Sequence, residues 1–390
     1  MSSITWKSAA WVSGAALAVG GCAAGIVIAA QIGGRADAGH AVKTAAVGPA
    51  AAQPLRVVSV SPPGGARDVN GAGRITVTYN QPLPAAAALP VLSPAVAGSW
   101  QRSGDAAVFQ PAAGYAPGTH VTVTATVTGD ASTRSKGAST SKGASTRSVA
   151  AASFTTGRYR TLRLQQVLAQ LGYLPLTWTP AAGAAAPAGN AAAQRAAAYA
   201  PPAGAFRWDR GYPAELHSFW VQGTANTLDQ GAVTGFEADH GLPADGTADA
   251  AVWKALLTAA AAGQRNTHGY SYAIARQQQP ETLTIWHDGR QVFSSPANTG
   301  IAASPTGIGT FPVYEKLPFQ VMQGINPDGT RYSDPVEWVS YFDGGDAVHY
   351  FDRYSYGWQQ SLGCVELPYA AAEKAYPYLP YGTLVTVTAE

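Results

Sequence analysis

The alternation of hydrophobic and polar positions divides the chain into four regions. Residues 1–34 are dominated by one long apolar run. Residues 55–157 alternate apolar and polar side chains in short runs bounded by Gly and Pro, which is typical of β-strands. Residues 158–263 instead place apolar side chains at helical spacing, and residues 264–390 return to strand-like alternation. The pattern predicts a multidomain, mostly β protein that contains one small α-helical domain.

The first apolar run predicts a membrane segment. It covers residues 8–32, which is longer than the ~7–15-residue apolar core of a cleaved signal peptide and suits a single span of ~20 residues. We therefore expect residues 1–34 to be an uncleaved membrane anchor, with lipoprotein processing at Cys22 and a cleaved signal as the alternatives. Residues 35–54 are rich in Ala and Gly without periodicity, which predicts a linker. The remainder is then expected to be extracytoplasmic.

The region 55–157 is predicted to form a β-sandwich. Its expected strands include a hairpin formed by residues 98–100 and 107–109. The pattern resembles bacterial immunoglobulin-like (Ig-like) domains, in which a terminal strand such as 153–156 closes the sandwich. A low-complexity stretch at 131–148 separates the last two strands with repeated Gly-Ala-Ser-Thr and Ser-Lys-Gly units, and we expect it to be a disordered surface loop.

The region 158–263 carries the helical pattern. The phrases LQQVLAQLGYLP at 164–175 and AVTGFEADHGLPADGTADAAVWKALL at 232–257 resemble the peptidoglycan-binding domain that accompanies many wall enzymes. An Ala/Pro-rich insert at 179–212 separates the two phrases. The resemblance implies a wall-binding module, and the alternative is a helical spacer that binds no ligand.

Composition narrows the function classes. The net charge is +2 over 390 residues, so the chain has no basic signature of nucleic-acid binding. Only 12% of residues are charged, while Gly (43) and Pro (27) are abundant, which favours turn-rich β-domains over long charged helices. Of the two cysteines, Cys22 lies inside the apolar run, so we expect no disulfide between it and Cys364.

The candidate chemistry surrounds Cys364. His349 precedes this cysteine by 15 residues, and Ser361 and Gly363 lie in the three positions directly before it. A thiol needs a base or a cationic neighbour to act as a nucleophile at neutral pH. It also needs backbone N–H donors for a developing oxyanion, and a neighbouring glycine lets the backbone approach closely. These few residues supply all three parts of a nucleophilic site.

The sequence argues against two other kinds of site, a metal site built from the histidines and a disulfide-exchange site at Cys364. The seven histidines show no metal-ligand spacing with a nearby carboxylate, so we expect neither a metal nor another cofactor. Cys364 has no CxxC partner, which argues against a disulfide oxidoreductase.

The segments SPTGIGTFPVYEK at 304–316 and HYFDRYSYGWQQSLGCVELP at 349–368 resemble the L,D-transpeptidase catalytic domain of the YkuD type. The resemblance covers residues 264–390. It implies acyl transfer through a thioester: Cys364 attacks the carbonyl between the L-centre of meso-diaminopimelate and the terminal D-alanine of a stem tetrapeptide. D-alanine leaves, and the side-chain amine of a second stem takes the acyl group to form a 3→3 cross-link.

The resemblance also assigns roles to individual residues. His349 would deprotonate Cys364, or hold it as a thiolate–imidazolium pair, and then protonate the departing amine. Backbone N–H groups of Cys364, Gly363 and Leu362 would form the oxyanion hole, and Ser361 would support the loop. A third group, often a backbone carbonyl in the family, orients the histidine, and Tyr350 is the nearest candidate position.

The expected substrate contacts are Tyr332, Trp338, Tyr341, Tyr350, Arg353 and Leu362. Two positions of the motif depart from the family pattern. Leu362 stands where many members have a second histidine, and Glu366 stands where Arg or Asn is common. A carboxylate near a thiolate raises the thiol pKa unless it is paired, and Arg353 is a candidate partner or a substrate-carboxylate ligand. A last group of aromatic residues is expected to cover the donor peptide, with core packing as the alternative: Tyr332, Trp338 and Tyr341.

The sequence therefore predicts a peptidoglycan L,D-transpeptidase, anchored to the cell membrane and facing the wall. Its expected partners are a donor tetrapeptide, an acceptor amine and inhibitory carbapenems. An L,D-carboxypeptidase or endopeptidase with the same site is one alternative, because water can replace the amine. A non-catalytic cell-wall-binding protein is the other, motivated by Glu366 and Leu362.

Overall fold

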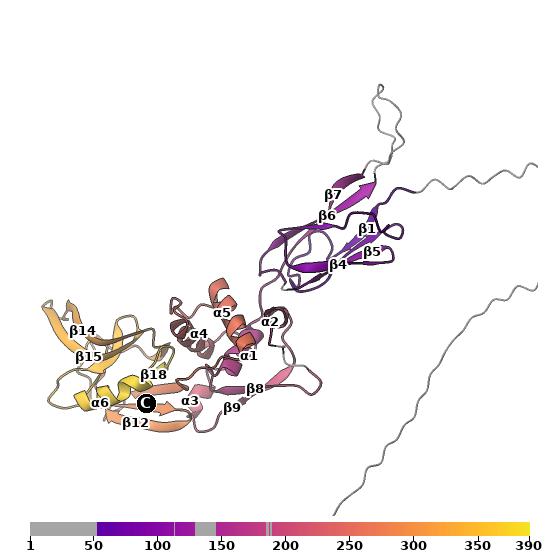
Figure 1. The fold of residues 1–390 in the computed structure, drawn as a ribbon. Helices are drawn as coiled ribbons and strands as arrows, with labels where there is room; N and C mark the ends of the chain where they lie inside the picture. The colour runs from indigo at the N-terminus through magenta and orange to yellow at the C-terminus, as the bar shows by residue number, and fades with distance from the viewer. Residues whose placement is uncertain (1–52, 113, 129–145, 185–186, 188) are drawn as a thin grey trace, which may run out of the picture. The chain divides into compact units, whose positions relative to one another are not determined.

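The computed structural model describes residues 53–112, 114–128, 146–184, 187 and 189–390 (Figure 1). The predicted anchor 1–34 and nearly all of the linker 35–54 lie outside the described residues. In the described part, no helix is long and apolar enough to span a membrane.

The N-terminal domain is a sandwich of two antiparallel sheets. One sheet has the order β1-β2-β5-β4, and the other has the order β3-β6-β7. Alternate side chains such as Val77 and Val123 are fully buried and form the core between the sheets, as strand periodicity predicts. Pairing of β4 with β5 confirms the predicted hairpin. The strands are β1 (Val57–Ser61), β2 (Ile75–Tyr79), β3 (Val91–Ser93), β4 (Gly98–Ser103), β5 (Ala106–Pro111), β6 (His120–Thr128) and β7 (Thr146–Thr155).

The predicted surface loop 131–148 ends earlier than expected, because strand β7 begins at Thr146. Residues 131–145 lie outside the described residues, but Thr146 to Ser148 pair with Thr128 to Thr126 of β6. The polar composition of these residues suggested a loop, whereas backbone pairing incorporates them at the exposed end of a strand.

Three helices form the body of the helical region: α1 (Thr161–Leu171), α4 (Thr227–Asp239) and α5 (Ala250–Ala262). The side chains of Asn226 and Asp249 accept hydrogen bonds from the first turns of α4 and α5, and Gly172 ends α1 at φ +82°. The predicted apolar face of α1 is buried in the core of this region.

The Ala/Pro-rich stretch 179–212 has regular structure of its own. Its helix α2 (Ala191–Tyr199) begins at Asn190, whose side chain accepts from the N–H of Ala193. Strand β8 (Leu176–Pro180) precedes this helix in the sequence and β9 (Gly204–Trp208) follows it, and the two strands pair with each other. The short helix α3 (Ala214–His217) comes next.

The C-terminal domain contains two sheets. The first has the order β12-β11-β10-β18-β13, and the second has the order β14-β15-β16-β17. Apolar side chains from both sheets and from α6 share one core. The elements are β10 (Ser271–Arg276), β11 (Thr282–His287), β12 (Arg290–Pro296), β13 (Gly309–Pro312), β14 (Glu315–Ile325), β15 (Arg331–Asp343), β16 (Asp346–Tyr350), β17 (Val365–Leu367), α6 (Tyr369–Ala375), the 3-10 turn η1 (Tyr376–Tyr378) and β18 (Leu384–Thr388). Together with the first two regions, this confirms the predicted multidomain, mostly β fold.

The helical region and the C-terminal domain share a hydrophobic core. Tyr272 and Ile274 of β10 and Leu384 of β18 are fully buried against the helices. At Gly231 of α4, an added Cβ would lie 2.6 Å from the carbonyl oxygen of Gly382 and 2.8 Å from a methyl group of Leu384. Glycine therefore permits the close approach of helix and strand at this point.

We expect Gly231→Val to destabilise this shared core by about 1–3 kcal/mol, because the added side chain has no room and forces the helix away from β18. Chemical denaturation of residues 35–390, the soluble fragment without the predicted anchor, measures the loss. Ala251→Val on the exposed face of α5 is the control and should cost less than about 1 kcal/mol. Equal stability of the two variants would contradict close packing at Gly231.

Candidate active site

The parallel pairing of β16 with β17 brings His349 and Cys364 to the same part of the sheet. His349 lies opposite Glu366, and Val348 lies opposite Val365. Cys364 directly precedes β17, and strand periodicity gives it the same face as Glu366. The histidine and the cysteine, which are 15 residues apart in the sequence, therefore line one cavity.

The imidazole of His349 is held in a defined tautomer. Its Nδ1 lies 2.8 Å from the backbone carbonyl oxygen of Tyr350. A carbonyl can only accept, so Nδ1 carries the proton and Nε2 has a free lone pair. Burial lowers the pKa of His349, while the Tyr350 hydrogen bond and Glu366 oppose this effect and Arg353 adds to it. The ring is thus neutral at pH 7 and can accept a proton through Nε2.

The thiol of Cys364 is also neutral in this structure. The pKa of Cys364 is raised to about 12, mainly by burial, while a backbone hydrogen bond at Ala347 opposes the shift and the carboxylates of Asp346 and Glu366 contribute to it. The sulfur lies 3.9 Å from the carbonyl oxygen of Gly345. Of the two predicted states, these surroundings favour a neutral thiol beside a neutral imidazole over a thiolate–imidazolium pair.

The loop before Cys364 is held by Ser361. The hydroxyl of Ser361 donates to the carbonyl oxygen of Cys364 at 2.6 Å and accepts from the N–H of Gly363 at 3.1 Å. This supports the predicted role of Ser361 in the loop. The same hydroxyl also occupies the N–H of Gly363, which is one of the predicted oxyanion donors. Gly363 has φ +124°, which favours glycine, and an added Cβ would lie 2.2 Å from a carboxylate oxygen of Asp346.

The unusual acidic residue Glu366 is paired. Its carboxylate is 4% exposed and accepts from Nε and Nη2 of Arg353 at 2.8 and 2.7 Å. Asn298 Nδ2 lies 3.4 Å from the same carboxylate, and Arg353 Nη2 also donates to the carbonyl oxygen of Gln360. The bidentate pair neutralises the charge that the sequence places two residues after the nucleophile. The pairing expected as one alternative for Arg353 is therefore present.

These groups surround a cavity of about 610 Å³ beneath the β14–β15 hairpin. Four of the predicted substrate contacts line it together with Cys364 and His349, namely Tyr332, Tyr341, Arg353 and Leu362. The sequence did not single out several other lining residues: Gln320, Met322, Asp334, Gly345, Asp346 and Phe351. The alternation along β14 and β15 was the available signal, but it does not identify which face covers the thiol.

Two predicted substrate contacts are not part of this cavity's lining. Tyr350 follows His349 in a strand, so its ring points to the opposite face and packs edge-on against Tyr369, with ring centres 5.0 Å apart. Trp338 packs against Tyr369 and Tyr376, at a bulge of β15 where its φ is +61°. Trp338 thus packs as the alternative expectation of core packing described. Tyr350 contributes only its backbone carbonyl to the site, through the hydrogen bond to His349.

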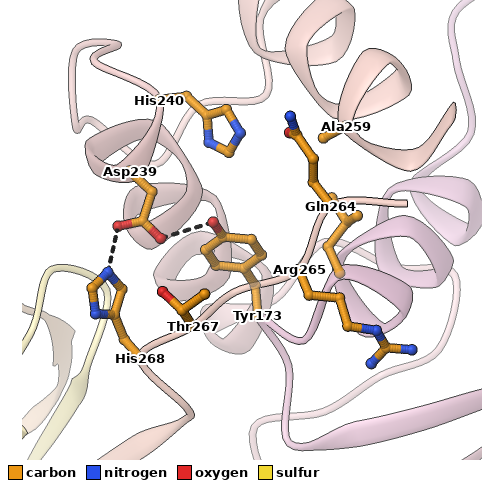
Figure 2. Close-up of a pocket in the computed structure, with 9 residues that line it drawn as sticks. Tyr173, Asp239, His240, Ala259, Gln264, Arg265, Thr267 and His268 are labelled. Carbon is orange, nitrogen blue, oxygen red and sulfur yellow. Dashed lines mark hydrogen bonds and ion pairs between the residues drawn. The ribbon is translucent and has the colours of Figure 1, made fainter. Parts of the chain in front are cut away.

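A second cavity, of about 340 Å³, lies in the helical region (Figure 2). Asp239 at the end of α4 accepts from the hydroxyl of Tyr173 at 2.8 Å and pairs with Nε2 of His268 at 3.3 Å. In the described part of the chain, no other group engages the side chains of Gln264 and Arg265, which also line this cavity. The wall thus offers hydrogen-bond donors beside the apolar surface of Leu171 and Ala259.

Family models match two parts of the chain. Residues 271–387 match the L,D-transpeptidase catalytic domain (YkuD), which includes the cavity with Cys364. The chain carries an L,D-transpeptidase catalytic domain. Residues 51–156 match the bacterial Ig-like domain (Big_5), so the predicted Ig-like sandwich is also confirmed. Neither match covers the helical region 158–263, whose resemblance to peptidoglycan-binding domains stays a prediction.

Solved structures of L,D-transpeptidases are similar to this chain. An enzyme from Mycobacterium smegmatis is 16% identical, with 86% of this chain and 100% of that chain covered and a TM-score of 0.29. The catalytic domain of the E. faecium enzyme is 25% identical, with 32% and 100% covered and a TM-score of 0.28. L,D-transpeptidase 3 from Mycobacterium tuberculosis, with a faropenem-derived adduct, is 16% identical, with 86% and 98% covered and a TM-score of 0.28. No similar sequence was found among curated proteins.

Metal ligation has no candidate in the described residues, because no three His, Cys, Asp or Glu side chains converge there.

We expect the alkylation rate of Cys364 by iodoacetamide to rise throughout the range from pH 7 to 9. The pKa of Cys364 is raised to about 12 by burial, so its thiolate fraction grows roughly tenfold per pH unit below that value. Mass spectrometry of the quenched protein measures the rate. A plateau below pH 8 would instead indicate a preformed thiolate.

We expect Arg353→Ala to lower the free energy of unfolding by about 3 kcal/mol, because it leaves the buried carboxylate of Glu366 without its cation. The double variant Arg353→Ala/Glu366→Gln removes that charge as well and should recover most of the loss. Denaturant titrations of the wild type and both variants test the coupling. Independent, additive effects of the two substitutions would contradict it.

Proposed function

We propose that this protein is a peptidoglycan L,D-transpeptidase that forms 3→3 cross-links through a thioester on Cys364. The observation that carries the proposal is that the thiol of Cys364 and the imidazole of His349 line the same cavity of a domain that matches the L,D-transpeptidase catalytic domain. The outward-facing location expected from the N-terminal segment suits a substrate in the wall.

In the first half-reaction, the donor tetrapeptide occupies the cavity beneath the β14–β15 hairpin. Nε2 of His349 takes the proton of Cys364 as the sulfur attacks the carbonyl carbon before D-alanine. The resulting oxyanion is stabilised by backbone N–H groups of the loop at Cys364. His349 then protonates the departing amine, so that D-alanine leaves and the thioester remains.

Proton transfer at the moment of attack agrees with the electrostatics of the two groups. The pKa of the thiol is raised and that of the imidazole is lowered, so a permanent ion pair would be costly in this cavity. The hydrogen bond to the Tyr350 carbonyl keeps Nε2 of His349 available, and it stabilises the imidazolium while the proton is held.

In the second half-reaction, an amine of another stem attacks the thioester. The C–N bond forms and the C–S bond breaks, and the proton lost from nitrogen passes through His349 to the sulfur. A hydrolase with the same site would use water at this step. Tyr332 and Tyr341 of the β14–β15 hairpin line the cavity in which the acceptor would have to bind.

We further propose that the helical region binds peptidoglycan through its own cavity. The donors of Gln264 and Arg265 are suited to the amide and carboxylate oxygens of stem peptides, and Leu171 and Ala259 offer an apolar wall. Since this region shares a core with the catalytic domain, binding would hold the catalytic cavity near the wall.

Incubating the soluble fragment with disaccharide-tetrapeptide should yield cross-linked dimer and free D-alanine, as followed by mass spectrometry. Cys364→Ala should yield neither, and His349→Gln should slow dimer formation by about 10²–10⁴-fold because the general base is lost. His287→Gln, in the same domain but outside the cavity lining, is the matched control. Tripeptide without dimer would indicate the hydrolase instead.

We expect a carbapenem to acylate Cys364, because the β-lactam carbonyl presents the same electrophile as the donor peptide. The intact-protein mass should rise by the mass of the drug, and Cys364→Ala should show no adduct. Absence of both adduct and product in the wild type would support a non-catalytic wall-binding protein.

Sedimentation with insoluble peptidoglycan tests the cavity of the helical region. We expect Gln264→Ala/Arg265→Ala to lower the sedimented fraction, because it removes the free donors from the wall of the cavity. Lys254→Ala, on the exposed face of α5, removes the same charge elsewhere and should sediment like the wild type. Identical sedimentation of both variants would assign wall binding to another surface.

A further inference from the structure

Asp346 stands beside the nucleophile, although nothing in the sequence pattern singles it out. It is the first residue of β16 and lines the same cavity as Cys364 and His349. Its carboxylate lies directly against Gly363, because a Cβ on that glycine would come within 2.2 Å of Oδ1. It therefore sits next to the loop on which the thioester forms.

The surroundings of Asp346 contain a carboxylate and a hydrogen-bond donor but no cation. The N–H of Gly307 donates to it, and Asp343 lies close by, as do the hydroxyl of Tyr314 and the thiol of Cys364. Among the described residues, no ion pair joins Asp346 or Asp343 to a basic side chain. Arg353, the guanidinium of this cavity, is committed to Glu366.

A carboxylate at this position opposes the first half-reaction. Asp346 contributes to the raised pKa of Cys364, since a negative charge disfavours a thiolate nearby. The second half-reaction has the opposite requirement, because its nucleophile is an amine that arrives as an ammonium ion. An uncompensated carboxylate in the cavity attracts that ion and can hold it by a charge-assisted hydrogen bond.

We propose that Asp346 binds the ammonium group of the acceptor stem peptide and places its nitrogen beside the thioester on Cys364. This inference rests on the proposed transpeptidase function and specifies its acceptor subsite. The ammonium releases one proton to solvent, and the amine attacks the thioester carbon. The C–N bond forms, the C–S bond breaks, and the second proton reaches the sulfur through Nε2 of His349.

Acidification should weaken this contact. Burial raises the pKa of Asp346 to about 6, with Asp343 adding to the shift and the Gly307 hydrogen bond opposing it. Above that pH the carboxylate is ionised and binds the ammonium, and below it the group becomes neutral and loses the charge. The ratio of dimer to hydrolysed tripeptide should therefore fall as the pH drops through about 6.

The test is Asp346→Asn in the soluble fragment, with disaccharide-tetrapeptide as donor and acceptor. We expect the acceptor KM to rise, and the ratio of dimer to tripeptide to fall, by about tenfold or more, as for loss of a charge-assisted hydrogen bond. Carbapenem acylation of Cys364 should be equal to or faster than in the wild type, because a negative charge near the thiol is gone. Asp352→Asn, which removes the same charge at an exposed position, should match the wild type in all three measurements.

A neutral nucleophile shows whether Asp346→Asn affects only the binding of a charged acceptor or damages the site as a whole. Hydroxylamine is largely uncharged at pH 7, so it should cleave the acyl-enzyme of Asp346→Asn as fast as that of the wild type. If dimers form in the wild type and Asp346→Asn keeps the same acceptor KM and product ratio, the role of Asp346 is refuted while the transpeptidase function stands. If the wild type acylates but never forms dimer, both proposals fail.

Discussion

The parallel pairing of β16 with β17 is the constraint on which the site depends. Three residue pairs join these short strands, and through them the thiol and the imidazole share one face of the sheet. The ion pair of Arg353 with Glu366 stabilises the same junction, because it ties the segment after β16 to β17. Glu366 is at once the register partner of His349 and the carboxylate of that pair. Loss of the pair would therefore leave a buried charge next to the thiol and the imidazole.

The electrostatics of the cavity suit the proposed reaction, whose two half-steps have opposite requirements. The nucleophile of the first step must become an anion, yet Asp346 and burial resist its ionisation. The nucleophile of the second step arrives as a cation, for which a negative cavity is favourable. A neutral resting thiol also limits unwanted reactions with other electrophiles. The proposed roles of His349 and Asp346 divide these two tasks between groups on the same strand.

The helical region and the catalytic domain form a continuous structure through their shared core. Residues of β10 and β18 are buried against α1 and α4, and Gly231 lets the helix approach the strand. A flexible linker would allow a binding module and a catalytic cavity to move independently. Here the buried contacts hold the second cavity and the thiol on one scaffold, so that wall binding would also orient the catalytic domain.

The sequence by itself determined the elements whose signals are local. Alternation predicted the sandwich strands, helical spacing predicted the apolar face of α1, and the spacing of His349, Ser361, Gly363 and Cys364 predicted a candidate catalytic set. Only the tertiary structure decided which neighbours these residues meet. It turned the rings of Tyr350 and Trp338 away from the cavity, paired Glu366 with Arg353 and placed Asp346 against Gly363. Strand pairing and bulges make such contacts between residues that are distant in the chain, and no local period records them.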